Sequence, residues 1–122
     1  MVDHFRPRLK GKRQEMVVAV FLNGQNQRLG EKDITEGIPT QATVYVRRVI
    51  EEALRLSAAA VVLVHNHLSG NPEPSAGDDE TTRDLLKACK LVQLVLLDHL
   101  IVGESEHYSY SDYGRLQELE NE

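Results

Sequence analysis

The apolar run at residues 60–64 (AVVLV) places the strongest constraint on how this chain can fold. Five consecutive apolar residues, three of them Val, are typical of a short central strand that is buried on both faces. A second run at residues 16–22 (MVVAVFL) predicts another buried strand. The Asn23-Gly24 pair after it favours a tight turn, so residues 27–30 are expected to return as the second strand of a hairpin.

Amphipathic segments alternate with the strands. Residues 43–57 carry apolar side chains at helical spacing and charged ones on the other side, which predicts a helix, and residues 78–90 predict a second one. The other expectations are a loop at 32–40, a strand at 91–97 and 99–102 broken at Asp98-His99, a strand at 107–110 and a helix at 111–119. Hairpins pair strands antiparallel and helical crossovers pair them parallel. The fold class is therefore α/β, a three-layer-like sandwich with a mixed β-sheet flanked by helices.

Composition excludes several classes of protein. A length of 122 residues suits one domain, and 41% apolar with 27% charged residues is ordinary globular usage, which excludes a wholly disordered chain. The apolar runs are too short for a membrane span, and the basic N-terminus does not resemble a signal peptide. Cys89 is the single cysteine, so no intrachain disulfide can form, and a cytoplasmic location is expected.

Charge divides the chain at residue 13. Residues 1–13 contain five basic residues and one acidic residue, whereas residues 14–122 contain nine basic and eighteen acidic ones. The basic head could contact nucleic acid, but a solvated tail or a linker is the more common meaning of such a stretch. The acidic remainder argues against a protein that coats a phosphate backbone. We therefore expect a basic tail or linker at 1–13 and a single domain at 14–122.

The segment at residues 65–78 (HNHLSGNPEPSAGD) carries the chemistry. His65 and His67 directly follow a predicted strand, where side chains two residues apart point to the same side. Asp78 comes eleven residues later, in the first turn of the predicted helix, and the intervening loop could return it to the same point. Two imidazoles and one carboxylate suit Zn²⁺ and leave a fourth position for water, as in catalytic sites. The alternative is structural, because Ser75-x-x-Asp78 also has the form of a helix-capping box.

The same segment resembles a known motif. The pattern H-x-H, seven residues, S-x-x-D resembles the JAMM (JAB1/MPN) metal-binding motif, and HNHxSGxPxPSxxD is similar to the signature of the RadC-like family, long named DNA repair protein RadC. The likeness runs from about residue 13 to residue 119 and includes ALRL at 53–56, LDHLIVG at 97–103, Tyr108-Ser109 and Gly114. Leu68 stands where the family usually has Pro, and Tyr45-Val46 where it usually has His-Pro. Family members usually carry an upstream helix-hairpin-helix region, so we expect either a short stand-alone member or the C-terminal domain of a longer protein.

The resemblance implies a cytidine-deaminase-like, JAB/MPN architecture and a JAMM-type zinc metallopeptidase that cleaves an amide or isopeptide bond in a protein or peptide. It implies that His65, His67 and Asp78 hold Zn²⁺. It further implies that Glu15 moves the proton of the attacking water and that Ser75 contacts the oxyanion or the water. Sequence spacing alone does not choose Glu15 over Glu31 or Glu36.

Other functions remain open at this point. The family's historical name implies an accessory or binding module in DNA repair or recombination, for which the basic head is the only support in the sequence. A non-catalytic MPN scaffold for protein interactions ranks last, because such scaffolds lose the ligands that this chain keeps. The Asp98-His99 pair lies inside an apolar strand and needs partners. A hydrogen-bonded core pair is favoured there over a position beside the zinc site.

Overall fold

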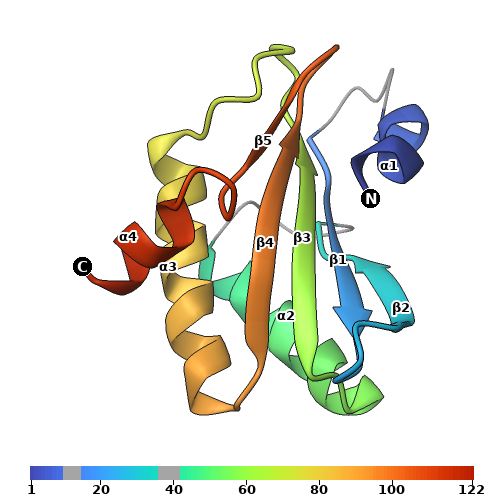
Figure 1. Cartoon of the computed structure of the whole chain (residues 1–122), viewed down its shortest axis with the longest axis vertical. Helices are drawn as coiled ribbons and strands as arrows, with labels where there is room; N and C mark the ends of the chain where they lie inside the picture. The colour runs from blue at the N-terminus through green and yellow to red at the C-terminus, as the bar shows by residue number, and fades with distance from the viewer. Residues whose placement is uncertain (10–14, 36–41) are drawn as a thin grey trace.

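A five-stranded mixed sheet forms the middle layer of the protein (Figure 1). The computed structural model describes residues 1–9, 15–35 and 42–122. The strands lie in the order β2-β1-β3-β4-β5, where β3 and β4 are parallel and the other neighbours are antiparallel. Their bounds are β1 Val17–Leu22, β2 Arg28–Asp33, β3 Ala60–Asn66, β4 Val95–Val102 and β5 His107–Ser109. The predicted mixed sheet with a buried central strand is confirmed, because every residue of β3 is buried.

Helices cover both faces of the sheet. One face packs against α2 and α3, and α4 lies against α3, whereas α1 lies on the opposite face (Figure 1). The bounds are α1 Val2–Leu9, α2 Ala42–Leu56, α3 Ala76–Leu91 and α4 Arg115–Glu120. The three-layer α/β arrangement is therefore confirmed. Among the helices of the described ranges, none has both the length and the apolar character that crossing a membrane requires.

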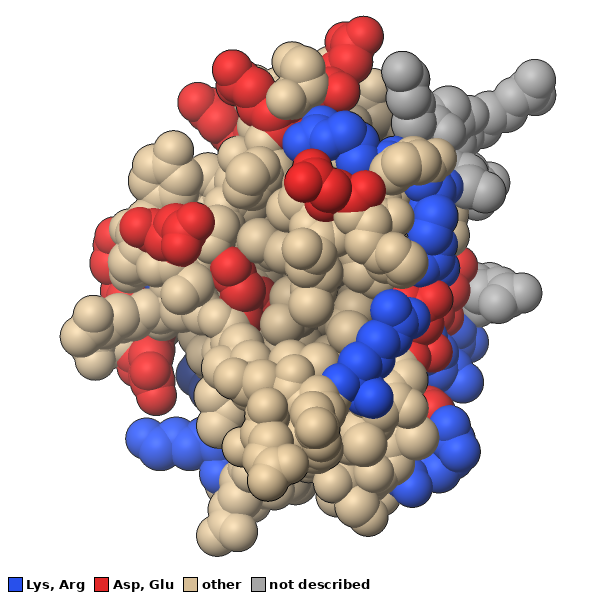
Figure 2. Space-filling model, turned by 45° about the vertical axis from the view of Figure 1, so that its right-hand side comes forward, with Lys and Arg blue, Asp and Glu red and all other residues tan. Residues whose placement is uncertain are grey.

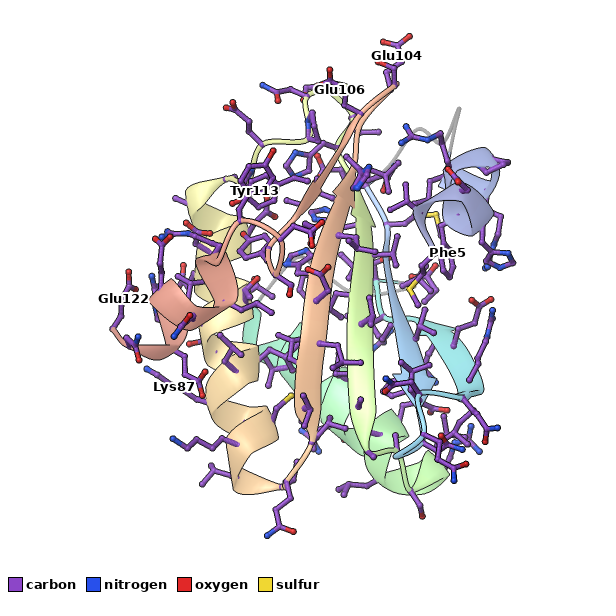
Figure 3. The ribbon with its side chains drawn as sticks, viewed as in Figure 1. Phe5, Lys87, Glu104, Glu106, Tyr113 and Glu122 are labelled. Carbon is purple, nitrogen blue, oxygen red and sulfur yellow. The ribbon has the colours of Figure 1, made fainter. Side chains whose placement is uncertain are left out.

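The first nine residues are part of the fold. Phe5 is only 1% exposed, and it packs with Leu9 against apolar side chains of β1, β3 and β4 (Figure 3). The expectation of a solvated tail is therefore wrong for Val2–Leu9, because two large apolar side chains among the basic ones suffice to dock one helix face. Residues 10–13 lie outside the described residues. The linker interpretation of the segment stays a prediction.

A bulge in β4 determines which of its side chains point to the face that α2 and α3 cover. Val61 pairs with Leu96 and Val62 pairs with Asp98, so Leu97 is the extra residue. Without the bulge, Leu96 and His99 would point to opposite faces; with it, both face α2 and α3. The strand continues through Asp98-His99 instead of breaking there, and it starts only at Val95 because residues 91–94 end α3 and form a turn.

The expected loop at residues 32–40 is corrected at its start. Lys32 and Asp33 belong to β2, where they pair with β1. Residues 36–40 lie outside the described residues.

Candidate metal centre

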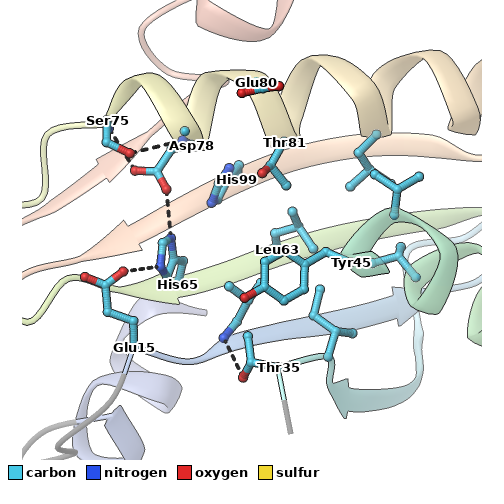
Figure 4. Close-up of a pocket in the computed structure, with 16 residues that line it drawn as sticks. Glu15, Thr35, Tyr45, Leu63, His65, Ser75, Asp78, Glu80, Thr81 and His99 are labelled. Carbon is cyan, nitrogen blue, oxygen red and sulfur yellow. Dashed lines mark hydrogen bonds and ion pairs between the residues drawn. The ribbon is translucent and has the colours of Figure 1, made fainter. Parts of the chain in front are cut away.

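Three elements meet at the end of β3. The antiparallel register pairs Val17 with His65, which brings Glu15, two residues before Val17, to the end of β3. Glu15 Oε1 lies 3.0 Å from His65 Nε2. Asp78 comes to the same place from the first turn of α3, on the other side of His65 (Figure 4).

The two imidazoles converge, as the spacing predicts. Their ring centroids are 4.9 Å apart, with the rings nearly perpendicular. Asp78 reaches both rings, because its Oδ2 lies 2.8 Å from His67 Nε2 and its Oδ1 lies 3.4 Å from His65 Nδ1. The structure therefore brings together His65, His67, Asp78 and Glu15.

The hydrogen bonds of His67 favour a cation at this place. His67 Nδ1 lies 2.9 Å from the carbonyl oxygen of Asn71, which can only accept, so Nδ1 carries the hydrogen. In the neutral ring, Nε2 then presents a lone pair to the carboxylate of Asp78 at 2.8 Å. Two acceptors at that distance repel each other unless a proton or a metal ion lies between them. A carbonyl that fixes the tautomer of a histidine is also the usual partner behind a metal ligand.

The donor set suits a divalent metal ion. Ligand atoms of Glu15, His65 and His67 all lie within 4.8 Å of one another, and Asp78 supplies a second carboxylate to the same two imidazoles. Two nitrogens and a carboxylate oxygen match the ligands that zinc takes in catalytic sites. The structure thus presents a candidate His-His-carboxylate metal site.

Burial sets the charge of these groups. Burial lowers the pKa of His65, and the nearby Asp78 carboxylate only partly opposes this, so the ring is neutral at pH 7. Burial would raise the pKa of Asp78, but the hydrogen bond from the Ser75 N–H and the neighbouring imidazoles keep it below its ordinary value. A neutral imidazole beside an ionised carboxylate is the protonation state in which these groups bind a metal.

The capping box is present as well. Ser75 Oγ accepts a hydrogen bond from the Asp78 N–H at 3.0 Å, and Asp78 Oδ2 accepts one from the Ser75 N–H at 2.8 Å. The capping and metal interpretations are therefore compatible, because the box holds the Asp78 carboxylate against the two imidazoles. Ser75 Oγ acts as an acceptor in the box, so its hydroxyl hydrogen remains available to a further partner.

Asp98 and His99 both have hydrogen-bond partners, as expected, but these partners lie on opposite faces of the sheet. Adjacent residues in a strand point to opposite faces, and Asp98 accepts a hydrogen bond from Ser109 Oγ at 2.6 Å. His99 is 2% exposed and lies beside His65, with the ring centroids 5.9 Å apart. Its Nδ1 is 2.7 Å from Thr82 Oγ1 on α3. His99 therefore combines the favoured hydrogen-bonded core position with the less favoured place beside the site, and the sequence contains no signal for the bulge that brings it there.

Glu31 and Glu36 are the two alternatives to Glu15 that the sequence leaves open. Glu31 lies on β2, where it forms ion pairs with Arg8 and Arg28. Glu36 lies outside the described residues. Among the described residues of β1, β2 and their flanks, Glu15 is the acidic residue that lies against His65.

Fold and site together define the class of protein: an α/β domain with a candidate metal centre at the end of its central strand. The family model described as RadC-like JAB domain matches residues 1–115, and the chain belongs to this family. The expected family resemblance is thereby confirmed.

Curated relatives agree with this assignment. The chain is 45% identical over 100 residues to a UPF0758 protein of Streptococcus sanguinis, covering 82% of this chain and 44% of that protein. It is 38% identical over 108 residues to a UPF0758 protein of Actinobacillus pleuropneumoniae serotype 5b, covering 88% and 49%, respectively. A third UPF0758 protein, from Geotalea uraniireducens, is 39% identical over 114 residues, covering 93% and 50%. The chain therefore spans about half the length of the curated relatives it matches.

Proposed function

We propose that the protein is a zinc-dependent hydrolase that cleaves an amide or isopeptide bond in a protein or peptide. One observation carries the proposal: Asp78 contacts both His65 and His67, and Glu15 lies against His65 at the same strand end. Membership of the RadC-like JAB family supports it.

His65, His67 and Asp78 would hold the zinc ion. They come from the buried end of β3, its following loop and the capped start of α3, so the backbone around them is ordered by the sheet and the helix. Zn²⁺ held there would activate a water molecule for attack and polarise the scissile carbonyl.

Glu15 and Ser75 would move the proton and stabilise charge. The side chain of Glu15 is 47% exposed, so its carboxylate can accept a proton from an attacking water and return it to the leaving amine. Ser75 already accepts a hydrogen bond from Asp78, so its hydroxyl hydrogen is free to donate to the developing oxyanion.

The test separates ligand from proton carrier. We expect near-stoichiometric zinc in the purified protein, a loss of tenfold or more in zinc affinity for Asp78→Asn, and unchanged affinity for Asp112→Asn, an exposed matched control. Glu15→Gln should keep the zinc and lose roughly 10²- to 10⁴-fold in peptide hydrolysis. Zinc retained by Asp78→Asn but lost by Glu15→Gln would overturn the assigned roles. A wild-type protein that binds no zinc would overturn the proposal.

The nucleic-acid alternative has less support among the described residues. Arg8 and Arg28 are both paired with Glu31, so these basic side chains are partly neutralised. On the face that Figure 2 draws, basic and acidic side chains are mixed along one edge and do not form a basic patch. The scaffold alternative ranks below hydrolysis because the candidate ligands are all present and converge.

A further inference from the structure

A cavity of about 340 Å³ opens directly beside the candidate metal centre (Figure 4). Its volume falls within the range of small-ligand sites, roughly 300–1,000 Å³. Glu15, His65 and Asp78 form one end of it. The cavity then extends between α2, α3 and the sheet.

The walls beyond the metal centre are mainly apolar. Tyr45, Val46 and Val49 come from α2, Leu63 from β3 and Leu85 from α3. All but Val46 are buried, so these walls belong to the packed core and their shape is defined by it. An apolar group that fills the space gains the free energy of leaving water.

Two buried ring nitrogens of cavity-lining residues have no hydrogen-bond partner among the described residues: His65 Nδ1 at the metal centre and His99 Nε2 beyond it. The Thr82 hydroxyl donates its single hydrogen to the Asp78 carbonyl at 2.7 Å. The same oxygen lies 2.7 Å from His99 Nδ1, so it must accept a hydrogen bond there, and His99 Nδ1 carries the hydrogen. His99 Nε2 is therefore a bare acceptor. It is buried, belongs to a residue that lines this cavity and has no hydrogen-bond partner among the described residues. A buried acceptor without a partner is costly, which favours a ligand with a donor.

We infer that the cavity is a specificity pocket for a tyrosine side chain next to the scissile amide. The aromatic ring contacts the apolar walls, and the phenol hydroxyl donates a hydrogen bond to His99 Nε2. The inference rests on the proposed function in one respect: the tyrosine belongs to a chain that the protein hydrolyses. Binding of a phenol in the pocket requires no reaction.

Binding of two small probes tests the pocket independently of catalysis. The 122-residue chain is titrated with p-cresol and with toluene, which differ by the hydroxyl, and methyl signals of Val46, Val49, Leu63 and Leu85 are followed by NMR. We expect both probes to shift these signals and p-cresol to bind about threefold to tenfold more tightly, as a hydrogen bond to a buried acceptor provides. Probes that leave these methyl signals unmoved would overturn the inference.

Matched variants assign the effect to named side chains. Val46→Trp, at the half-buried part of the wall, should weaken both probes at least tenfold, whereas Leu54→Trp on the exposed side of α2 should change neither. His99→Phe should remove the preference for p-cresol. Thr82→Val removes the hydroxyl that fixes the tautomer of His99, so it should reduce the preference for p-cresol. This variant replaces His99→Phe in the test if His99→Phe does not fold. A preference that survives both changes would contradict the role of His99.

Peptide hydrolysis distinguishes the two proposals. If peptides are cleaved, those with Tyr beside the scissile bond should be cleaved faster than those with Phe or Lys, and Val46→Trp should abolish this ranking. Cleavage without any ranking would refute the pocket and leave the hydrolase intact. Probe binding as expected in a protein that cleaves no peptide would support the pocket and refute the hydrolase.

Discussion

Replacement of Phe5 by alanine tests whether α1 is a structural part of the domain. Phe5 is 1% exposed and packs against the face of the sheet opposite α2 and α3. The guanidinium of Arg8 lies 4.8 Å from its ring centroid, a cation–π contact that the substitution also removes. The measurement is urea unfolding at pH 7, which reports the free energy of unfolding and its slope.

The size of the effect follows from burial and from the place of the helix. A buried Phe covers about 150–250 Å² of surface, which at about 25 cal/mol per Å² corresponds to roughly 4–6 kcal/mol. Measured Phe→Ala changes in cores are about 3–5 kcal/mol. An eight-residue helix at the edge of the fold can shift to fill part of the space, so we expect about 3 kcal/mol.

The control and the refutation are equally specific. Leu54→Ala removes apolar atoms from a side chain that is 61% exposed, and it should change stability by no more than about 0.5 kcal/mol. If Phe5→Ala costs less than about 1 kcal/mol, α1 is not docked as described. The solvated-tail interpretation of the first nine residues would then be correct after all.

Three further changes test other parts of the fold by the same unfolding measurement. Gly103→Ala should lower the free energy of unfolding by about 1–3 kcal/mol, because the new Cβ would meet the backbone oxygen of Gly70, in the loop that follows His67. An unchanged urea midpoint would contradict this. Burial would raise the pKa of Asp79, but Arg115 holds it below its ordinary value. The stabilisation by Asp79 is therefore present above the unfolded pKa of about 3.9 and lost as pH falls through the folded value, so Asp79→Asn should cost about 1 kcal/mol at pH 7 and progressively less as the pH falls below the unfolded value. A pH-independent difference would refute that reasoning. Ser75→Ala should cost about 1 kcal/mol through loss of the helix cap, and a smaller loss for Ser75→Gly would agree with capping.

Local patterns in the chain predict most of the elements. The runs at 16–22 and 60–64 become β1 and β3, and the amphipathic segments become α2 and α3 with boundaries shifted by one or two residues. These predictions succeed because strand and helix periodicity and the Ser75 cap are properties of neighbouring residues. The docking of α1 is missed because its basic residues dominate the composition, while its buried apolar side chains are only Phe5 and Leu9.

Some residues of the candidate site can be predicted from local sequence, and one cannot. His65, His67 and Asp78 stand out in the sequence, because one strand end and one helix start bring them together over a short loop. Glu15 is fifty residues from His65, and only the β1–β3 register brings the two side chains within 3.0 Å.

The sequence by itself determined the class of fold, the family and the two imidazoles with their partner Asp78, because each depends on contacts close along the chain. The tertiary structure alone decided that Val2–Leu9 packs on the sheet and that His99 faces the cavity. The docking of Val2–Leu9 needs the apolar face that β1, β3 and β4 build together. The position of His99 depends on the pairing of β3 with β4, where a single extra residue at Leu97 moves His99 to the other face.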